Sequence, residues 1–269
     1  MSGGGEPLSS FHPVVRRWFE RRFPAPTDIQ ARAWPAIGRG ENVLITAPTG
    51  SGKTLTAFLF SLTRLLSGDW ESGATRVLYV SPLKALNNDV RRNLLGPLDE
   101  LTKEFADADI ASPEIRVLTR SGDTPQRERQ RMVRKPPEVL ITTPESLNLI
   151  LTSVRARRIL TGIRCVILDE IHAVAGTKRG THLITALERL TLLSGEFQRI
   201  AISATVKPMN QVADLVGGFR HLGGESYEPR QVHVIESPTT KELTLQTRYL
   251  SPKAEDDEES IWDALTSEF

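Results

Sequence analysis

Short apolar runs rich in β-branched residues alternate along this chain with segments of helical spacing, and this alternation constrains the fold more than any other feature. Seven such runs occur, at residues 43–45, 77–80, 115–118, 139–141, 165–168, 200–202 and 232–235. Runs of this kind are typical of strands buried on both faces. Between them, apolar residues recur at helical spacing, as at Leu55, Leu59, Leu62 and Leu66. The alternation predicts an α/β fold, a doubly wound, mostly parallel sheet with helices on both faces.

Composition narrows the class of protein further. The chain has 269 residues and a formal net charge of +1, which argues against a globally basic nucleic-acid coat protein and against an acidic solvating chain. It contains no apolar run of about 18 residues that would span a membrane, and its first residues lack the pattern of a secretory signal. The single cysteine, Cys165, cannot form an internal disulfide. We expect a cytoplasmic protein.

A glycine-rich stretch follows the first predicted strand. Residues 47–54 read APTGSGKT, which matches the phosphate-loop pattern GxxxxGK[ST] except that alanine stands at the first glycine position. Glycines let backbone N–H groups converge on phosphate oxygens, and the next helix points its positive end at them. The predicted ATP-binding residues here are Thr49, Gly50, Ser51, Gly52, Lys53 and Thr54. Lys53 is expected on the β- and γ-phosphates and Thr54 on Mg²⁺; a Gly/Ser turn with an incidental lysine is the alternative.

Two adjacent carboxylates, Asp169 and Glu170, follow the apolar run at 165–168. In a phosphate-loop enzyme the first acid holds Mg²⁺ and the next polarises the attacking water. We therefore expect Asp169 to be a metal ligand, and Glu170 and Lys53 to be catalytic. Helix capping is the alternative for the acids. A lone histidine is as often structural as functional, but beside two acids His172 favours a role near the γ-phosphate.

The phosphate loop and the sequence DEIH at 169–172 together resemble superfamily 2 helicases of the DExH type. The resemblance implies a RecA-like phosphate-loop NTPase domain. The residues around Gln30 resemble the adenine-reading motif of these helicases, since an amide can pair with the adenine N6/N7 edge; a surface glutamine on a helix is the alternative. Ser203 and Thr205 resemble the coupling motif of the family, and with His172 they are expected to report nucleotide state.

Three further stretches resemble the nucleic-acid motifs of the same helicases. They are SPLKAL at 81–86, TRSGDT at 119–124 and TTPESL at 142–147, and each follows a predicted strand. Hydroxyls, helix N-termini and basic side chains at strand ends are suited to binding phosphates. Ordinary helix capping by Ser or Thr is the alternative, and one hydroxyl can do both. The expected nucleic-acid contacts are Pro82, Lys84, Arg120, Gly122, Thr143, Pro144 and Ser146.

More specifically, the chain resembles the large helicase-related (Lhr) family of bacteria and archaea. The resemblance is carried by VSPLKALNN at 80–88, TTPESL at 142–147 and LDEIHAVAGTKR at 168–179, followed by GTHL at 180–183 and LERL at 187–190. It implies a DNA-repair-associated translocase that uses ATP and Mg²⁺, moves 3′ to 5′ on single-stranded DNA and unwinds duplexes, RNA:DNA hybrids included. Ski2-like helicases are near neighbours of this family.

The resemblance also predicts the domain organisation. Superfamily 2 motors bind ATP between two RecA-like domains, and the second supplies an arginine finger in a QxxGRxxR-like motif. Only 64 residues follow Thr205, and none of them matches that motif. We therefore expect a disordered stretch at 1–10, the first RecA-like domain at 11–250, and an acidic linker with the start of a truncated second domain at 251–269.

This organisation predicts weak ATP–Mg²⁺ binding and very slow hydrolysis by the chain alone, because loss of an arginine finger costs on the order of 10³–10⁵ in rate. The expected partners are single-stranded DNA or an RNA:DNA hybrid, and a second RecA-like domain in cis or in trans. A standalone module that binds nucleotide or nucleic acid without productive hydrolysis is the alternative. A phosphate-loop NTPase unrelated to nucleic acid has no need of the runs at 81–86 and 142–147.

Basic residues concentrate in one stretch, although the net charge of the chain is near zero. Between residues 116 and 135 only Asp123 and Glu128 are acidic, whereas the basic residues are Arg116, Arg120, Arg127, Arg129, Arg131, Arg134 and Lys135. A solvated helix face and a direct contact with DNA phosphates both fit this pattern. The salt dependence of single-strand binding distinguishes them, because phosphate contacts steepen it.

Overall fold

The computed structural model describes residues 6–48, 50–82, 84–204 and 207–237, with the backbone alone at 84–89 and 92. Thr49 and Thr205 lie outside the described residues, as do 1–5 and the segment 238–269 that includes the expected linker. Residues 6–10 form a turn in which Leu8 is buried in the core and the carbonyl of Ser9 accepts a hydrogen bond from Arg16. The disorder expected for residues 1–10 is therefore wrong for residues 6–10, because burial of Leu8 anchors them.

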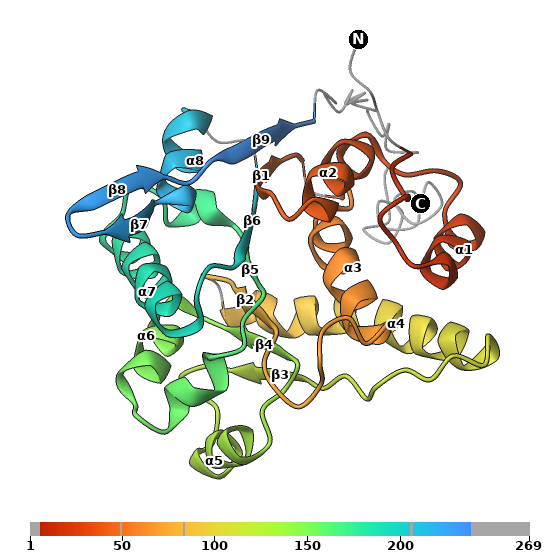
Figure 1. Cartoon of the computed structure of the whole chain (residues 1–269), viewed down its shortest axis with the longest axis horizontal. Helices are drawn as coiled ribbons and strands as arrows, with labels where there is room; N and C mark the ends of the chain where they lie inside the picture. The colour runs from red at the N-terminus through yellow and green to blue at the C-terminus, as the bar shows by residue number, and fades with distance from the viewer. Residues whose placement is uncertain (1–5, 49, 83, 205–206, 238–269) are drawn as a thin grey trace, which may run out of the picture. The chain divides into compact units, whose positions relative to one another are not determined.

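Seven strands form one sheet, and every neighbouring pair in it runs parallel. Their order across the sheet is β3-β4-β2-β5-β6-β1-β9 (Figure 1). The strands are β1 Asn42–Thr46, β2 Val77–Val80, β3 Val117–Arg120, β4 Val139–Thr142, β5 Cys165–Leu168, β6 Gln198–Ser203 and β9 Val232–Glu236. The predicted parallel α/β sheet is confirmed, with the third strand two residues later in the chain than expected.

Strand residues alternate between two apolar cores, one on each face of the sheet. In β1, for example, Val43 and Ile45 belong to one core and Leu44 to the other. The first core is covered by α1 Pro13–Arg22, α2 Asp28–Gly38, α3 Lys53–Leu66 and α4 Lys84–Asp107. The second is covered by α5 Gln126–Arg134, α6 Pro144–Thr152, η1 Ala156–Leu160, η2 Ile171–Ala173, α7 Lys178–Ser194 and α8 Met209–Gly217 (Figure 1). None of the helices in the described ranges is long and apolar enough to cross a membrane.

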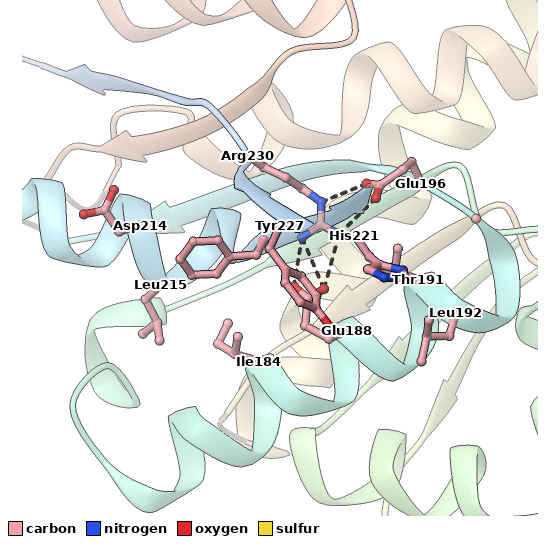
Figure 2. A pocket seen from close by; sticks show the side chains of 13 residues that line it. Ile184, Glu188, Thr191, Leu192, Glu196, Asp214, Leu215, His221, Tyr227 and Arg230 are labelled. Atoms are coloured by element: carbon pink, nitrogen blue, oxygen red, sulfur yellow. Dashed lines mark hydrogen bonds and ion pairs between the residues drawn. The ribbon is translucent and has the colours of Figure 1, made fainter. Parts of the chain in front are cut away.

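A separate antiparallel hairpin, β7 Phe219–Gly223 with β8 Ser226–Pro229, joins α8 to β9. Sequence analysis missed it because all its residues are exposed, so it lacks the buried periodicity that marks a strand. The hairpin and α7 border a groove of about 1070 Å³ with apolar side chains such as Ile184, Leu192 and Tyr227 in its lining (Figure 2). This groove therefore lies away from the strand ends where the predicted motifs fall.

Candidate nucleotide and nucleic-acid site

The carboxyl ends of all seven parallel strands meet at one edge of the sheet, which is where ligands bind to doubly wound sheets. Strand order divides this edge into two halves. Neighbouring strands β5, β6 and β1 bring together the acidic pair after Leu168, the end of β6 at Ser203, and the phosphate loop after Thr46. Neighbouring strands β3, β4 and β2 bring together the three predicted nucleic-acid motifs. The two halves adjoin because β2 and β5 are paired.

The backbone of the phosphate loop depends on two glycines. Gly50 and Gly52 have φ angles of +82° and +85°, a left-handed conformation that glycine adopts at little cost. Gly52 also lies against Gln30, so closely that a Cβ atom on it would stand 3.0 Å from the side-chain Nε2. Helix α3 begins directly after Gly52 without a side-chain cap. The first N–H groups of α3 are therefore oriented toward the loop, as an anion site requires.

Lys53 turns back onto its own loop. Its Nζ donates hydrogen bonds to the carbonyl oxygens of Ala47 at 2.5 Å and Pro48 at 2.8 Å. Burial lowers the pKa of Lys53, while the charges of Glu170 and Asp169 act in the opposite direction. Among the described residues, the ammonium group is therefore hydrogen-bonded to neutral carbonyls alone, and a phosphate group can replace them with a stronger, charge-assisted bond.

Asp169 lies at the end of β5 in a largely buried position. The hydroxyl of Tyr79 donates to its Oδ2, and the backbone N–H of Glu170 donates to its Oδ1 at 2.8 Å. Burial raises the pKa of Asp169, and the neighbouring charge of Glu170 adds to this effect. Sequence analysis missed Tyr79. Its signal was a tyrosine inside an otherwise aliphatic strand, since a buried phenol needs a hydrogen-bond partner.

Glu170 has a φ angle of +48°, a left-handed conformation that is uncommon outside glycine, asparagine and aspartate. This turn directs the chain from β5 into η2 and brings three polar side chains together. The Nδ1 atom of His172 lies 3.2 Å from the Oε2 of Glu170 and 3.2 Å from the Oγ of Ser203. His172 therefore connects the acidic pair to the end of β6.

Gln30 is buried, with 4% of its surface exposed, so the alternative of a surface glutamine is wrong. Its side-chain Oε1 accepts a hydrogen bond from the backbone N–H of Thr27 at 2.9 Å, and its backbone N–H donates to the Thr27 hydroxyl. These two bonds form a capping box at the start of α2. Thr27 also donates from Oγ1 to the carbonyl of Ser51 at 3.1 Å. Gln30 thus lies beside the phosphate loop with its carbonyl oxygen already engaged.

The hydroxyls of the TTPESL motif cap helix α6. Thr143 Oγ1 accepts from the backbone N–H of Ser146 at 3.3 Å and lies 3.2 Å from its Oγ, and Pro144 occupies the first turn. All three residues are buried. The capping interpretation therefore describes their contacts within the chain, and a phosphate at this position would meet the N-terminus of α6. The side chain of Lys84 lies outside the described residues.

Arg179 joins two of the predicted nucleic-acid motifs. Its Nη2 donates to the carbonyl of Pro82 at 2.6 Å, and its guanidinium pairs with Glu145, with Nε 2.5 Å from Oε1. These contacts tie α7 to the loop that follows β2 and to the first turn of α6. Sequence analysis did not identify Arg179 or Glu145 as site residues, because partners 34 and 97 positions apart leave no local pattern.

Arg120, at the end of β3, is only 8% exposed. Its Nη1 atom is buried and has no hydrogen-bond partner among the residues that the structure describes. Burial lowers the pKa of Arg120, and the nearby positive charge of Arg129 has the same effect. Arg129 itself donates from Nη2 to the carbonyl of Gly122 at 2.7 Å. Arg129 therefore holds the loop after β3, while Arg120 forms no ion pair with a carboxylate of the described residues.

Magnesium fits the oxygen donors of this site. Within the described ranges, no group of three or more His, Cys, Asp or Glu side chains is arranged to hold a metal. Mg²⁺ in phosphate-transfer sites takes only one or two protein oxygens and completes its shell with phosphates and water. Asp169 and the half-buried hydroxyl residue Thr54 supply donors of this kind. A cation beside Asp169 would also offset the burial that raises the pKa of its carboxyl.

Comparison with protein families agrees with this geometry. Residues 27–214 match the DEAD/DEAH box helicase family. The chain belongs to this family. It is 48% identical over 97% of its length to the Lhr helicase/probable uracil glycosylase of Mycolicibacterium smegmatis, and 45% identical over 91% to the ATP-dependent helicase Lhr-Core of Methanothermobacter thermautotrophicus. The predicted resemblance to Lhr helicases is confirmed. This helicase chain spans 17% and 28% of the lengths of these two relatives.

Comparison with solved structures shows the same fold in known helicases. The structure of Mycobacterium smegmatis helicase Lhr bound to ssDNA and AMP-PNP is 44% identical, with a TM-score of 0.82 over 98% of this helicase chain and 33% of that chain. The structure of Mss116p bound to ssRNA and AMP-PNP matches 87% of this chain and 46% of that chain at 16% identity, with a TM-score of 0.69, and this likeness shows the fold alone. The RecA-like domain expected from the sequence is confirmed.

Proposed function

We propose that this chain is the ATP-binding, first RecA-like domain of an ATP-dependent DNA helicase or translocase. One observation carries the proposal: the phosphate loop, the acidic pair and the three nucleic-acid motifs all follow strands that end at the same edge of the sheet. The ATP half and the nucleic-acid half of that edge adjoin at the β2–β5 pair. A motor needs such adjacency to couple hydrolysis to movement along a strand.

In this proposal the phosphate loop binds ATP. Backbone N–H groups of Gly50, Ser51 and Gly52 face the phosphates, and Thr49 belongs to the same loop. Lys53 exchanges the carbonyls of Ala47 and Pro48 for oxygens of the β- and γ-phosphates. Gln30 approaches adenine with its Nε2, because its Oε1 is engaged by Thr27.

The acidic pair divides two tasks. Thr54 and Asp169 would hold Mg²⁺, which when bound neutralises charge on the phosphates. Glu170 accepts a proton from the attacking water while the water oxygen bonds to the γ-phosphorus and the bond to ADP breaks. Its left-handed backbone and its contact with His172 orient the carboxylate for this role.

Coupling to nucleic acid runs through the end of β6. His172 contacts both Glu170 and Ser203, so a change at the γ-phosphate alters the hydrogen bonds at the start of the segment that follows β6, where Thr205 lies. The expected nucleic-acid contacts at the other half of the edge are Pro82, Lys84, Arg120, Gly122, Thr143, Pro144 and Ser146. Single-stranded DNA is the proposed ligand, with RNA:DNA hybrids as a further substrate.

Full turnover in this proposal needs a second RecA-like domain, in cis or in trans, that supplies the arginine finger. The first domain then extends over residues 11–250, with residues 251–269 as an acidic linker and the start of the second RecA-like domain. Movement 3′ to 5′ and a role in DNA repair follow from the similarity to Lhr helicases. The cytoplasmic location stays a prediction. The second candidate is a module that binds nucleotide and DNA without hydrolysis.

The test is the ATPase rate of the 269-residue chain with and without single-stranded DNA, measured alone and with a second RecA-like domain of an Lhr helicase supplied. We expect slow turnover alone and a DNA-stimulated rate higher by on the order of 10³–10⁵ with both domains. Lys53→Ala and Glu170→Gln should abolish it, whereas Lys103→Ala, an exposed lysine of α4, should not. Turnover that survives both substitutions contradicts the proposal. Nucleotide and DNA binding without any stimulated turnover favours the binding module.

A further inference from the structure

Helix α5 and the neighbouring η1 carry a group of exposed arginines that no catalytic or coupling role uses. Helix α5 follows β3, the edge strand of the sheet (Figure 1), and η1 packs against α5. Six exposed arginines make up the group, which we call the arginine stripe: Arg127, Arg131 and Arg134 of α5, and Arg155, Arg157 and Arg158 at η1.

The spacing on α5 places its three arginines on one face. Positions 127, 131 and 134 are separated by four and three residues, so they line one side of the helix over about 10 Å of its axis. Met132, the buried residue of α5, faces the apolar core instead. Because Met132 anchors one side of α5 to the core, the three arginines of α5 face solvent.

The stripe lacks acidic partners within the part of the chain that the structure describes. Several arginines elsewhere pair with carboxylates, as Arg116 does with Glu138 and Arg179 with Glu145. No ion pair involves any stripe arginine among the described residues, and Glu128 is the only acidic residue within α5 and η1. Six cations against one carboxylate repel one another, and an anionic ligand removes that repulsion.

The stripe is continuous with the predicted nucleic-acid half of the sheet edge. Arg129 of α5 donates hydrogen bonds to the carbonyls of Ser121 and Gly122, which fastens the helix to the loop after β3. At the base of that loop, Arg120 has a buried Nη1 without a partner in the described chain, and the Nε of Arg129 is in the same condition. Unmatched positive charge thus begins at the end of β3 and continues along α5.

We infer that the arginine stripe binds the phosphodiester backbone of the same single strand that crosses the sheet edge, and so extends its path from β3 along α5 to η1. The inference rests on the proposed function. Neither α5 nor η1 contains an aromatic residue on which a base could stack. The contacts are therefore made to phosphates and are independent of base sequence.

The test compares oligo-dT of two lengths, about 6 and about 20 nucleotides, in anisotropy titrations of the 269-residue chain over a range of salt concentrations. The variant is Arg127→Gln/Arg131→Gln/Arg134→Gln. The matched control is Arg17→Gln/Arg189→Gln, two exposed arginines on α1 and α7 that also have no ion pair among the described residues. We expect the triple variant to weaken binding of the long oligonucleotide by about tenfold and to flatten its log–log salt slope by about 2, at roughly 0.7 per phosphate contact. Binding of the short oligonucleotide and both measurements on the control should change by less than about twofold.

Several outcomes would overturn the inference. An unchanged affinity and slope for the long oligonucleotide shows that the stripe is only a solvated surface. An equal loss for both lengths shows that the arginines act on the sheet edge and do not extend it. Competition by polyglutamate at the stripe as strong as that by oligo-dT identifies an acidic protein as the ligand. If the unmodified chain binds neither length, the proposed function fails as well, before any variant is measured.

Discussion

The two ends of strand β6 carry clusters of charged side chains that are built in opposite ways. Near its start, Arg199 is fully buried and donates to Glu188 at 3.0 Å and to the carbonyls of Val216 and Gly217 at 2.8 and 2.7 Å. At its end, Ser203 contacts His172 beside two carboxylates. The first cluster opposes each charge with a charge or with the carbonyl end of α8. The second cluster places the two negatively charged carboxylates next to each other.

A second arginine completes the cluster at the start of β6. Arg230 pairs with Glu196 at 2.8 Å and with Glu188 at 3.0 Å, and Figure 2 shows both contacts beside the groove bordered by α7. At the other end, burial raises the pKa of Asp169 and lowers that of Lys53. Both Nη atoms of Arg199 find partners inside the chain, and its Nε is buried without a partner among the described residues. The charged groups of the second cluster are those that we propose a ligand satisfies. The comparison separates residues that stabilise the fold from residues that we propose take part in the reaction.

The largest effect should follow from Glu170→Gln. The substitution keeps the size of the side chain but removes the carboxylate that we propose as the general base, a role that contributes typically 10²–10⁴ in rate. We expect a loss of that size in DNA-stimulated turnover, measured with the second RecA-like domain supplied, and a change in unfolding free energy below about 0.5 kcal/mol. A loss of unfolding free energy well above about 0.5 kcal/mol would contradict the division between the two clusters.

Arg199→Ala should lower the stability of the fold and leave nucleotide binding nearly unchanged. It removes one partner from a buried ion pair and takes the arginine donor away from the carbonyl of Val216, while Gly217 and Glu188 keep only their bonds to Arg230; we expect a cost of about 3 kcal/mol. Urea unfolding should show this loss, while the nucleotide affinity of the folded protein, measured at low temperature, stays within about twofold of the unmodified chain. A selective loss of nucleotide affinity without a loss of stability would place Arg199 in the functional site.

A smaller effect concerns the contact between His172 and Ser203. In a double-mutant cycle of His172→Ala and Ser203→Ala, residues in direct contact show coupling of about 0.5–3 kcal/mol. We expect that coupling in the stimulation of turnover by DNA and not in nucleotide affinity. Additive effects of the two substitutions on stimulation would show that the contact transmits nothing.

The smallest effect is a pH dependence from Glu196. Burial acts to raise the pKa of Glu196, but hydrogen bonding and charge from Arg230 outweigh it and hold the pKa below its ordinary value. The unfolded chain therefore takes up a proton at higher pH than the folded chain, and this stability is lost as the pH falls below about 4.5. Because its side chain is 40% exposed, the contribution stays below about 1 kcal/mol. Glu196→Gln should flatten the acid limb of unfolding free energy against pH by that amount, and an unchanged limb would contradict it.

Much of the fold was predictable because each buried strand and each amphipathic helix leaves a local pattern. The strand order was not, since it depends on how crossovers pack and not on any one segment. The exposed hairpin β7–β8 was missed for lack of burial. Arg199 was also missed, although an arginine inside the apolar strand QRIAIS must find buried partners.

The candidate site was predictable where its residues are contiguous. The phosphate loop and the acidic pair are read directly from 47–54 and 169–172, and strand order brings them together as expected. Contacts between distant segments were not predictable, such as Tyr79 with Asp169. The stripe on α5 was visible as composition, but only the structure shows that its arginines face solvent without acidic partners in the described chain.

The capping box at Thr27 and Gln30 has a consequence for how this domain can change its nucleotide preference. The same amide starts helix α2, contacts the glycine of the phosphate loop and is the proposed adenine reader. Base selectivity and helix nucleation therefore share one side chain. A substitution at Gln30 that relaxes the selectivity for adenine also removes the capping box of α2. A change of base preference at this position therefore lowers the stability of the domain.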